Sequence, residues 1–90
     1  MQFVSIGFLR AGTDAGPEIL QQTIGFLEQP YIQITSAGAL RDEGDRRVGM
    51  MMIFDAPTRA AAEALVKESP FLKADLYEQH HLFEYLDEVG

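Results

Sequence analysis

The chain has 90 residues, of which 47% are hydrophobic and 23% charged, and this composition predicts a single globular domain over residues 1–90. Fourteen acidic residues outweigh seven basic ones, so the net charge is −7 and neither nucleic acid nor an anionic membrane is an expected partner. Because the sequence lacks cysteine, a membrane-spanning apolar run and the basic start of a signal peptide, we expect a cytoplasmic protein.

The N-terminal half of the chain predicts a strand, a helix and a second strand. Residues 3–9 are rich in Phe, Val and Ile, as is typical of a strand. After a glycine-containing loop, a helix is expected to begin at Pro17, and Pro30 marks its end. Residues 31–37 predict the second strand, and Gly38 predicts a kink in its continuation.

The C-terminal half predicts two more strands around a second helix. An acidic turn, in which Gly44 is expected to take a positive φ, leads into an apolar strand over residues 48–54. Thr58 is a suitable N-cap for the helix that follows. The remaining expected elements are that helix, one further helical turn, a fourth strand and a loose tail, over residues 59–67, 71–76, 77–86 and 87–90.

This order, β-α-β-β-α-β, is the pattern of the ferredoxin-like or split βαβ fold, in the α+β class. It predicts a four-stranded antiparallel sheet with both helices on one face. The third strand is apolar on both faces, so the second face of the sheet also needs cover. A second copy of the chain is the expected cover, which predicts a homodimer with facing sheets.

Motifs spread over nearly the whole chain resemble the YciI-like, or YCII-related, family. They are Ala37-Gly38-Ala39-Leu40 before the acidic turn, Gly49, Ala62-Glu63-Ala64-Leu65-Val66, Ser69-Pro70-Phe71 and Lys73-Ala74-Asp75-Leu76-Tyr77. The resemblance implies a dimeric α+β barrel with a cleft near the dimer interface. For some members it also implies lyase-like chemistry on small organic molecules, such as dehydrochlorination of a ring; most members have no established reaction.

The chain departs from this family at the two positions of its proposed catalytic pair. That pair is a His on the first helix and an Asp in an Asp-Pro-aromatic motif, and the two positions fall on Thr23 and Ser69. Neither hydroxyl titrates near neutral pH, so the two cannot move a proton as a His–Asp pair does. Both could orient a ligand in the cleft; alternatively, Thr23 packs on its helix and Ser69 ends the second helix.

His81 is the candidate for acid–base work. His80 and His81 are neighbours on a predicted strand, so they point to opposite faces and cannot bind one metal together. By parity, His81 shares the face of Tyr77 and Phe83, which is expected to line the dimer barrel. One bulge would reverse this choice in favour of His80, and a structural or surface role is the alternative for either.

Arg10 and Tyr31 complete the candidate site. The guanidinium of Arg10 could hold a carboxylate, or it could pair with Asp14 or with an acid on the fourth strand. Tyr31, like Tyr77, could bind the ligand or transfer a proton. Arg47, after the acidic turn, is expected to be solvated. No metal or cofactor is expected, because the methionines of the third strand fit core packing and the acidic turn lacks calcium-ligand spacing.

Three functions are consistent with these features. The first is binding of a small organic acid or ring compound, without the usual dyad chemistry. The second is a lyase or isomerase in a cleft near the dimer interface, in which Arg10 holds an anionic group, His81 or a tyrosine transfers a proton, and hydroxyls orient the substrate. The third is a structural or protein-interaction homodimer.

Overall fold

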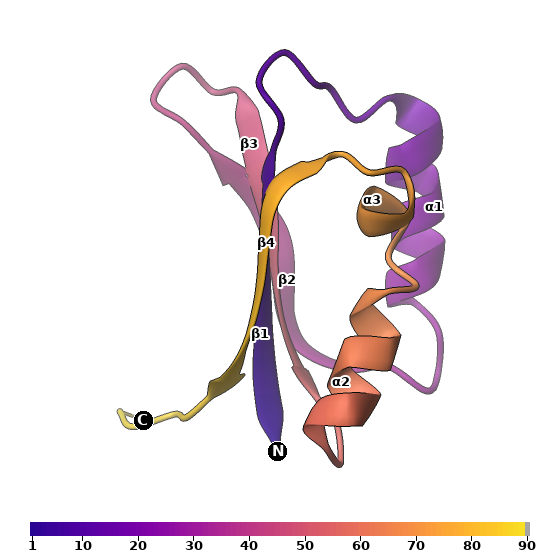
Figure 1. The fold of residues 1–90 in the computed structure, drawn as a ribbon, viewed down its shortest axis with the longest axis vertical. Coiled ribbons are helices and arrows are strands. Elements are labelled where there is room, and N and C mark those ends of the chain that lie inside the picture. The colour runs from indigo at the N-terminus through magenta and orange to yellow at the C-terminus, as the bar shows by residue number, and fades with distance from the viewer. Residues whose placement is uncertain (90) are drawn as a thin grey trace.

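A computed structural model describes residues 1–89 and contains the predicted order of elements, including the further helical turn before the last strand (Figure 1). The elements are β1 (Gln2–Leu9), α1 (Pro17–Leu27), β2 (Gln33–Arg41), β3 (Arg47–Asp55), α2 (Arg59–Val66), α3 (Pro70–Lys73) and β4 (Tyr77–Tyr85). Residues 86–89 have no regular secondary structure, and Gly90, the end of the predicted tail, lies outside the described residues.

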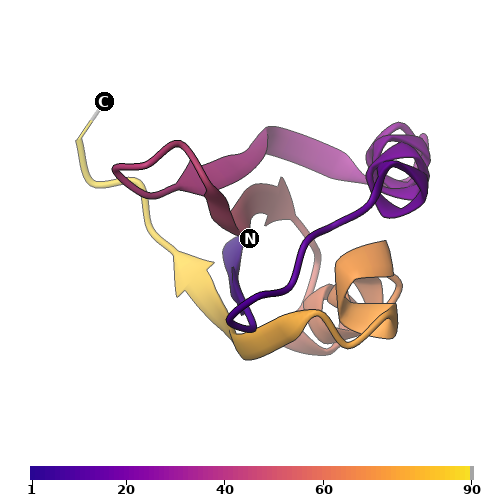
Figure 2. The same ribbon diagram turned by 90° about the horizontal axis from the view of Figure 1, so that it is seen from above.

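The four strands form one antiparallel sheet in the order β2-β3-β1-β4. All the helices lie on one side of this sheet, and no element of the described chain covers the other side (Figures 1 and 2). The chain therefore has the ferredoxin-like fold, as its order of elements predicts. None of the helices within residues 1–89 has the length and apolar character needed to cross a membrane.

The core lies between the sheet and the helices. Phe3 of β1 and Phe54 of β3 are opposite each other in the sheet, and their ring centroids are 6.1 Å apart. Ala62 of α2 is fully buried against this layer, because its small side chain lets the helix approach the sheet. Of the three consecutive methionines in β3, Met52 faces this core, as a packing role predicts.

Two local predictions about glycines are wrong. In the β2–β3 turn, Asp45 rather than Gly44 takes the left-handed conformation, with φ of 62°. The Oδ1 atom of Asp42 accepts hydrogen bonds from the backbone of Gly44 and Arg46, which closes the turn without a left-handed glycine. In β2 the register shift lies between Ile34 and Ser36, before the expected kink at Gly38.

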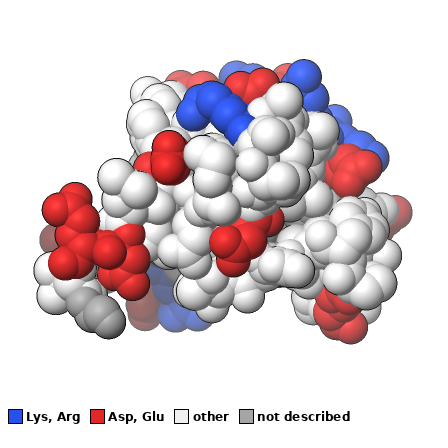
Figure 3. Space-filling model, turned by 90° about the horizontal axis from the view of Figure 1, so that it is seen from below, with Lys and Arg blue, Asp and Glu red and all other residues white. Residues whose placement is uncertain are grey.

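Figure 3 shows how charged side chains are distributed on one end of the molecule. Seen from the end that Figure 3 shows, acidic groups outnumber basic ones and uncharged residues cover most of the surface. This distribution agrees with the net charge of −7.

Replacing Thr58 by Ala is expected to lower the free energy of unfolding by about 1 kcal/mol. The Thr58 side chain accepts a hydrogen bond from the backbone of Ala61 and so caps α2. Urea unfolding measures the loss. The Thr58→Ser variant keeps a capping hydroxyl and should retain most of the stability, so an equal loss in both variants would contradict the capping role.

Candidate functional site

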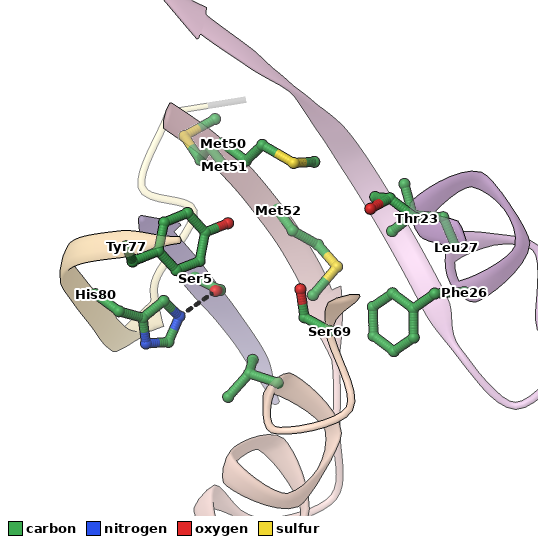
Figure 4. A pocket seen from close by; sticks show the side chains of 11 residues that line it. Ser5, Thr23, Phe26, Leu27, Met50, Met51, Met52, Ser69, Tyr77 and His80 are labelled. Carbon is green, nitrogen blue, oxygen red and sulfur yellow. Dashed lines mark hydrogen bonds between the residues drawn. The ribbon is translucent and has the colours of Figure 1, made fainter. Parts of the chain in front are cut away.

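A small cavity lies between the helix-covered face of the sheet and the helices (Figure 4). Its volume is about 30 Å³. Apolar side chains form most of its wall, and a few hydroxyls and one imidazole interrupt them. The lining residues are Ser5, Thr23, Phe26, Leu27, Met50, Met51, Met52, Val66, Ser69, Tyr77 and His80.

The register of β4 decides which of its side chains reach this cavity. Gln79 pairs with Phe8 and Tyr77 pairs with Leu9, so β4 carries an extra residue, Glu78, at this point. The bulge turns the side chain of Tyr77 to the helix side of the sheet, where His80 also lies.

The bulge corrects part of the strand assignment made from the sequence. The prediction that Tyr77 shares a face with His81 is wrong. His81 pairs with Ile6 on the uncovered face of the sheet, where its ring stacks on Phe83 with centroids 5.8 Å apart. His81 does share a face with Phe83, as parity predicts, but His80 is the histidine that lines the cavity.

Tyr77 is the centre of an aromatic stack. Its ring centroid lies 5.8 Å from that of Phe71 and 5.6 Å from that of His80, and both pairs are nearly parallel. The ring also lies against Gly7 of β1, where a Cβ atom would collide with it. A glycine at this position in β1 therefore provides the space that the tyrosine ring occupies.

Ser5 and His80 are joined by a hydrogen bond of 2.8 Å between Oγ and Nε2 (Figure 4). The two residues are 75 positions apart in sequence and come from neighbouring strands. Burial lowers the pKa of His80, and the nearby charge of His81 lowers it further. The imidazole is therefore neutral at pH 7 and can accept a proton.

The phenol of Tyr77 has the opposite character. Burial raises the pKa of Tyr77 to about 12, although the positive charge of Arg47 acts to lower it. The hydroxyl stays protonated at neutral pH and can donate a hydrogen bond into the cavity, toward which it points in Figure 4.

Thr23 of α1 and Ser69, which precedes α3, line the same cavity (Figure 4). Thr23 is 5% exposed, and its hydroxyl donates a hydrogen bond of 2.8 Å to the carbonyl of Ile19 within α1. Ser69 stands at the N-cap position of α3, not at the end of α2, and its side chain makes no capping hydrogen bond. The Ser69 hydroxyl is thus available to a ligand.

Arg10 and Tyr31 lie outside this cavity. Arg10 pairs with Asp75 in the loop before β4, with 2.9 Å between Nη2 and Oδ1. Arg10 therefore forms an ion pair, as one of the two predictions for it states, but the partner of Arg10 is neither Asp14 nor an acid on β4. Tyr31 is 64% exposed and borders a separate hollow near Met1.

An open groove adjoins the cavity between α1 and β2. It has a volume of about 270 Å³ and shares Thr23, Leu27 and Met50 with the inner cavity. Small residues of β2, Ala37 and Ala39 among them, border the groove. They leave the space opposite α1 unfilled.

Arg47 also lines this groove. The register of β2 and β3 shifts by one residue just beside Arg47, between the pairs Leu40–Gly49 and Arg41–Arg47. With this bulge, the side chain of Arg47 points toward the helices. Its guanidinium lies 6.0 Å from the centre of the Phe71 ring. Arg47 is therefore partly buried, and its side chain borders open hollows rather than extending freely into solvent. Within residues 1–89 no carboxylate forms an ion pair with it, so the charge can meet an anionic group.

The chemistry available here is hydrogen bonding and proton transfer. Across the described part of the chain, no three His, Asp or Glu side chains are grouped closely enough to hold a metal ion. The cavity instead combines a neutral imidazole, a protonated phenol and serine hydroxyls within an apolar wall. The sequence does not point to Ser5, and it offers His80 only as the alternative that one bulge in the fourth strand would favour.

Comparisons with known proteins support the fold. No protein-family model matches the sequence, and no curated protein sequence matches at a significant level. Among solved structures, the chain is similar to 5-chloro-2-hydroxyhydroquinone dehydrochlorinase (TftG) from Burkholderia phenoliruptrix AC1100, in complex with 2,5-dihydroxybenzoquinone. The TM-score is 0.83 at 20% identity, over 96% of this chain and 94% of that chain.

Two further solved structures are more distant. An antibiotic biosynthesis monooxygenase has a TM-score of 0.57 at 16% identity, over 99% of this chain and 98% of that one. A variant of SnoaB, a cofactor-independent oxygenase from Streptomyces nogalater, has a TM-score of 0.51 at 18% identity, over 98% and 94%. At these identities the comparisons establish a shared fold.

The buried position of His80 predicts a pH-dependent stability. The folded-state pKa of His80 is below 6.5, so the unfolded chain takes up this proton at a higher pH than the folded chain does. The free energy of unfolding should therefore fall as the pH drops below about 6.5. Urea unfolding at pH 7.5 and pH 5.5 measures the difference in unfolding free energy between the two pH values. This difference should shrink in His80→Gln and largely persist in His81→Gln. If it were unchanged in His80→Gln, protonation of His80 would not be the cause of the pH dependence.

Proposed function

We propose that this chain is a YciI-like protein that binds a small, flat, hydroxylated ring between its sheet and its first helix. The observation that carries the proposal is the cavity that Thr23 and Ser69 line together with Tyr77 and His80. These are the two positions at which the resembled family has its dyad, and they meet at one apolar hollow with few polar groups. Such a hollow is typical of a small-molecule site.

The space available supports a ligand that enters from the groove. An apolar cavity of about 150 Å³ is enough to hold benzene, whereas the inner cavity of about 30 Å³ holds only water. The adjoining groove of about 270 Å³ is large enough for a ring, and Met50 stands where the two meet. Because a methionine side chain is flexible and unbranched, it can move to let the ring reach the inner wall.

The polar groups favour a ring with oxygen substituents. Arg47 offers an unpaired positive charge at the groove, which suits a phenolate, an enolate or a carboxylate. Deeper in, Tyr77 and Ser69 can hydrogen-bond a hydroxyl or a carbonyl. The similar structure of TftG was solved with 2,5-dihydroxybenzoquinone, a ring of this kind, which supports the same ligand class here.

Binding without the usual dyad chemistry is the first proposal, because Thr23 and Ser69 carry no group that titrates near neutral pH. A lyase or isomerase is the second candidate, and the hydrogen bond between Ser5 and His80 is the observation that favours it. A purely structural role leaves the cavity and its polar groups without a purpose.

We also propose that the protein is a homodimer. The face of the sheet that lacks helices presents apolar side chains from three strands, and Phe83 is 54% exposed there. They are Val4, Ile6, Phe8, Met51, Ile53 and Phe83. A second copy of the same sheet would cover this surface symmetrically.

The ligand proposal predicts that the wild-type protein binds 2,5-dihydroxybenzoquinone in isothermal titration calorimetry. Replacing Arg47 by Ala should weaken binding about tenfold or more, because the variant loses a charge-assisted hydrogen bond of about 1.5–3 kcal/mol. Arg46→Ala is the matched control, since Arg46 is exposed and does not line the groove. Absence of binding by the wild type would contradict the proposal, and an equal loss in both variants would remove the role of Arg47.

The dimer proposal predicts a mass of about twice the 10.0 kDa chain in light scattering coupled to size exclusion. Phe83→Glu should give a monomer, because it places a carboxylate in the apolar interface. Tyr31→Glu changes another exposed aromatic side chain, in the loop before β2, and should remain dimeric. A monomeric wild type, or a dimer that survives in Phe83→Glu, would contradict this arrangement.

A further inference from the structure

The inner wall of the cavity contains a hydroxyl and a neutral base in direct contact. Ser5 of β1 and His80 of β4 lie on neighbouring, paired strands, and 2.8 Å separates Oγ of Ser5 from Nε2 of His80. The Tyr77 ring stacks on the imidazole and limits its rotation. A base that is hydrogen-bonded to a hydroxyl and positioned by its surroundings is the arrangement that general-base catalysis requires.

We propose that Ser5 and His80 form a proton-accepting pair that interconverts the enol and keto forms of a hydroxylated ring bound in the cavity. This inference rests on the proposed function, because it needs the ring to reach the inner wall. It moves the acid–base group from α1 and α3, where the resembled family has its pair, to β1 and β4. The substrate class is a ring with at least one hydroxyl whose keto tautomer is accessible.

The step needs no co-reactant. The hydroxyl proton of the ring passes to the Ser5 oxygen while the Ser5 proton passes to Nε2 of His80. The electron pair of the broken O–H bond becomes the second bond of a carbonyl, and a ring π pair forms a new C–H bond. The proton for that bond returns from the imidazolium, so the net change is a tautomerisation without oxidation or reduction.

The groups around His80 suit this role. Tyr77 stacks on the imidazole ring of His80, and its hydroxyl stays protonated at neutral pH. This hydroxyl can therefore donate a hydrogen bond to the carbonyl oxygen that develops on the substrate. The one other histidine, His81, lies on the opposite face of the sheet and disfavours the imidazolium by charge repulsion. The positive charge of Arg47 acts to lower the pKa of Tyr77. Arg47 also lines the groove, where its charge favours an anionic form of the bound substrate ring. No carboxylate forms an ion pair with His80 in residues 1–89.

The test uses 1,3,5-trihydroxybenzene, whose ring protons exchange with D₂O through its keto tautomer. Proton NMR follows the loss of the ring signal at pD 7.5, with and without protein, and calorimetry gives the dissociation constant. We expect the wild-type protein to accelerate exchange above the buffer rate. His80→Gln and Ser5→Ala should lose about 100-fold or more of that acceleration while the dissociation constant changes less than threefold. His81→Gln should retain it.

The pH profile distinguishes proton transfer from a structural role. In the wild type, the protein-catalysed rate should fall toward acidic pH with a midpoint below the ordinary pKa of histidine, because burial lowers the pKa of His80 and a protonated imidazole cannot accept a proton. If the wild type does not bind the ring, the proposed function fails and this inference fails with it. If it binds the ring without accelerating exchange, or if His80→Gln exchanges as fast as the wild type, the inference alone is overturned.

Discussion

Between Tyr77 and Gln79, β4 carries one residue more than the stretch of β1 that it faces, and the geometry of the site depends on this extra residue. In a regular strand Tyr77 and His80 would point to opposite faces. The bulge at Glu78 turns both toward the helices, where their rings stack. It thereby assembles the cavity wall and leaves His81 on the apolar face of the sheet.

Neighbouring strands then hold this arrangement in place. Gly7 of β1 leaves the space in which the Tyr77 ring lies. Phe71 of α3 stacks against the same Tyr77 ring. Ser5, two residues before Gly7, shares the same face and meets His80. Because both strands belong to one hydrogen-bonded ladder, the hydroxyl and the imidazole are positioned before any ligand arrives, which lowers the entropic cost of using them.

The order of elements, the sheet and the helix-covered face could be predicted from the sequence, because proline stops, the Thr58 cap and apolar runs each report on local structure. Thr23 and Ser69, the two positions that the resemblance singles out, both line one cavity. These features depend on spacing and on side-chain type. A strand pattern or a helix cap can be recognised without knowledge of the rest of the fold.

The identity of the cavity histidine could not be predicted in the same way, because it depends on a register shift between strands that are far apart in sequence. A one-residue shift reverses the face of every side chain beyond it. The same reason applies to Arg47, which a second bulge turns toward the groove. The ion-pair partner of Arg10 could not be predicted either. Asp75 lies in the loop before β4 and has a left-handed backbone with φ of 56°, so its position follows from no regular strand or helix pattern. Such contacts arise only when the elements pack.

If Ser5 and His80 carry the polar chemistry of the cavity, a bound hydroxylated ring contacts His80 and not His81. The chain has two histidines, so nitrogen NMR of histidine-labelled protein gives one signal set from each side of the sheet. On addition of 2,5-dihydroxybenzoquinone, the imidazole nitrogen shifts of His80 should change and those of His81 should not. Equal changes at both histidines, or a change at His81 alone, would contradict contact between the ring and His80.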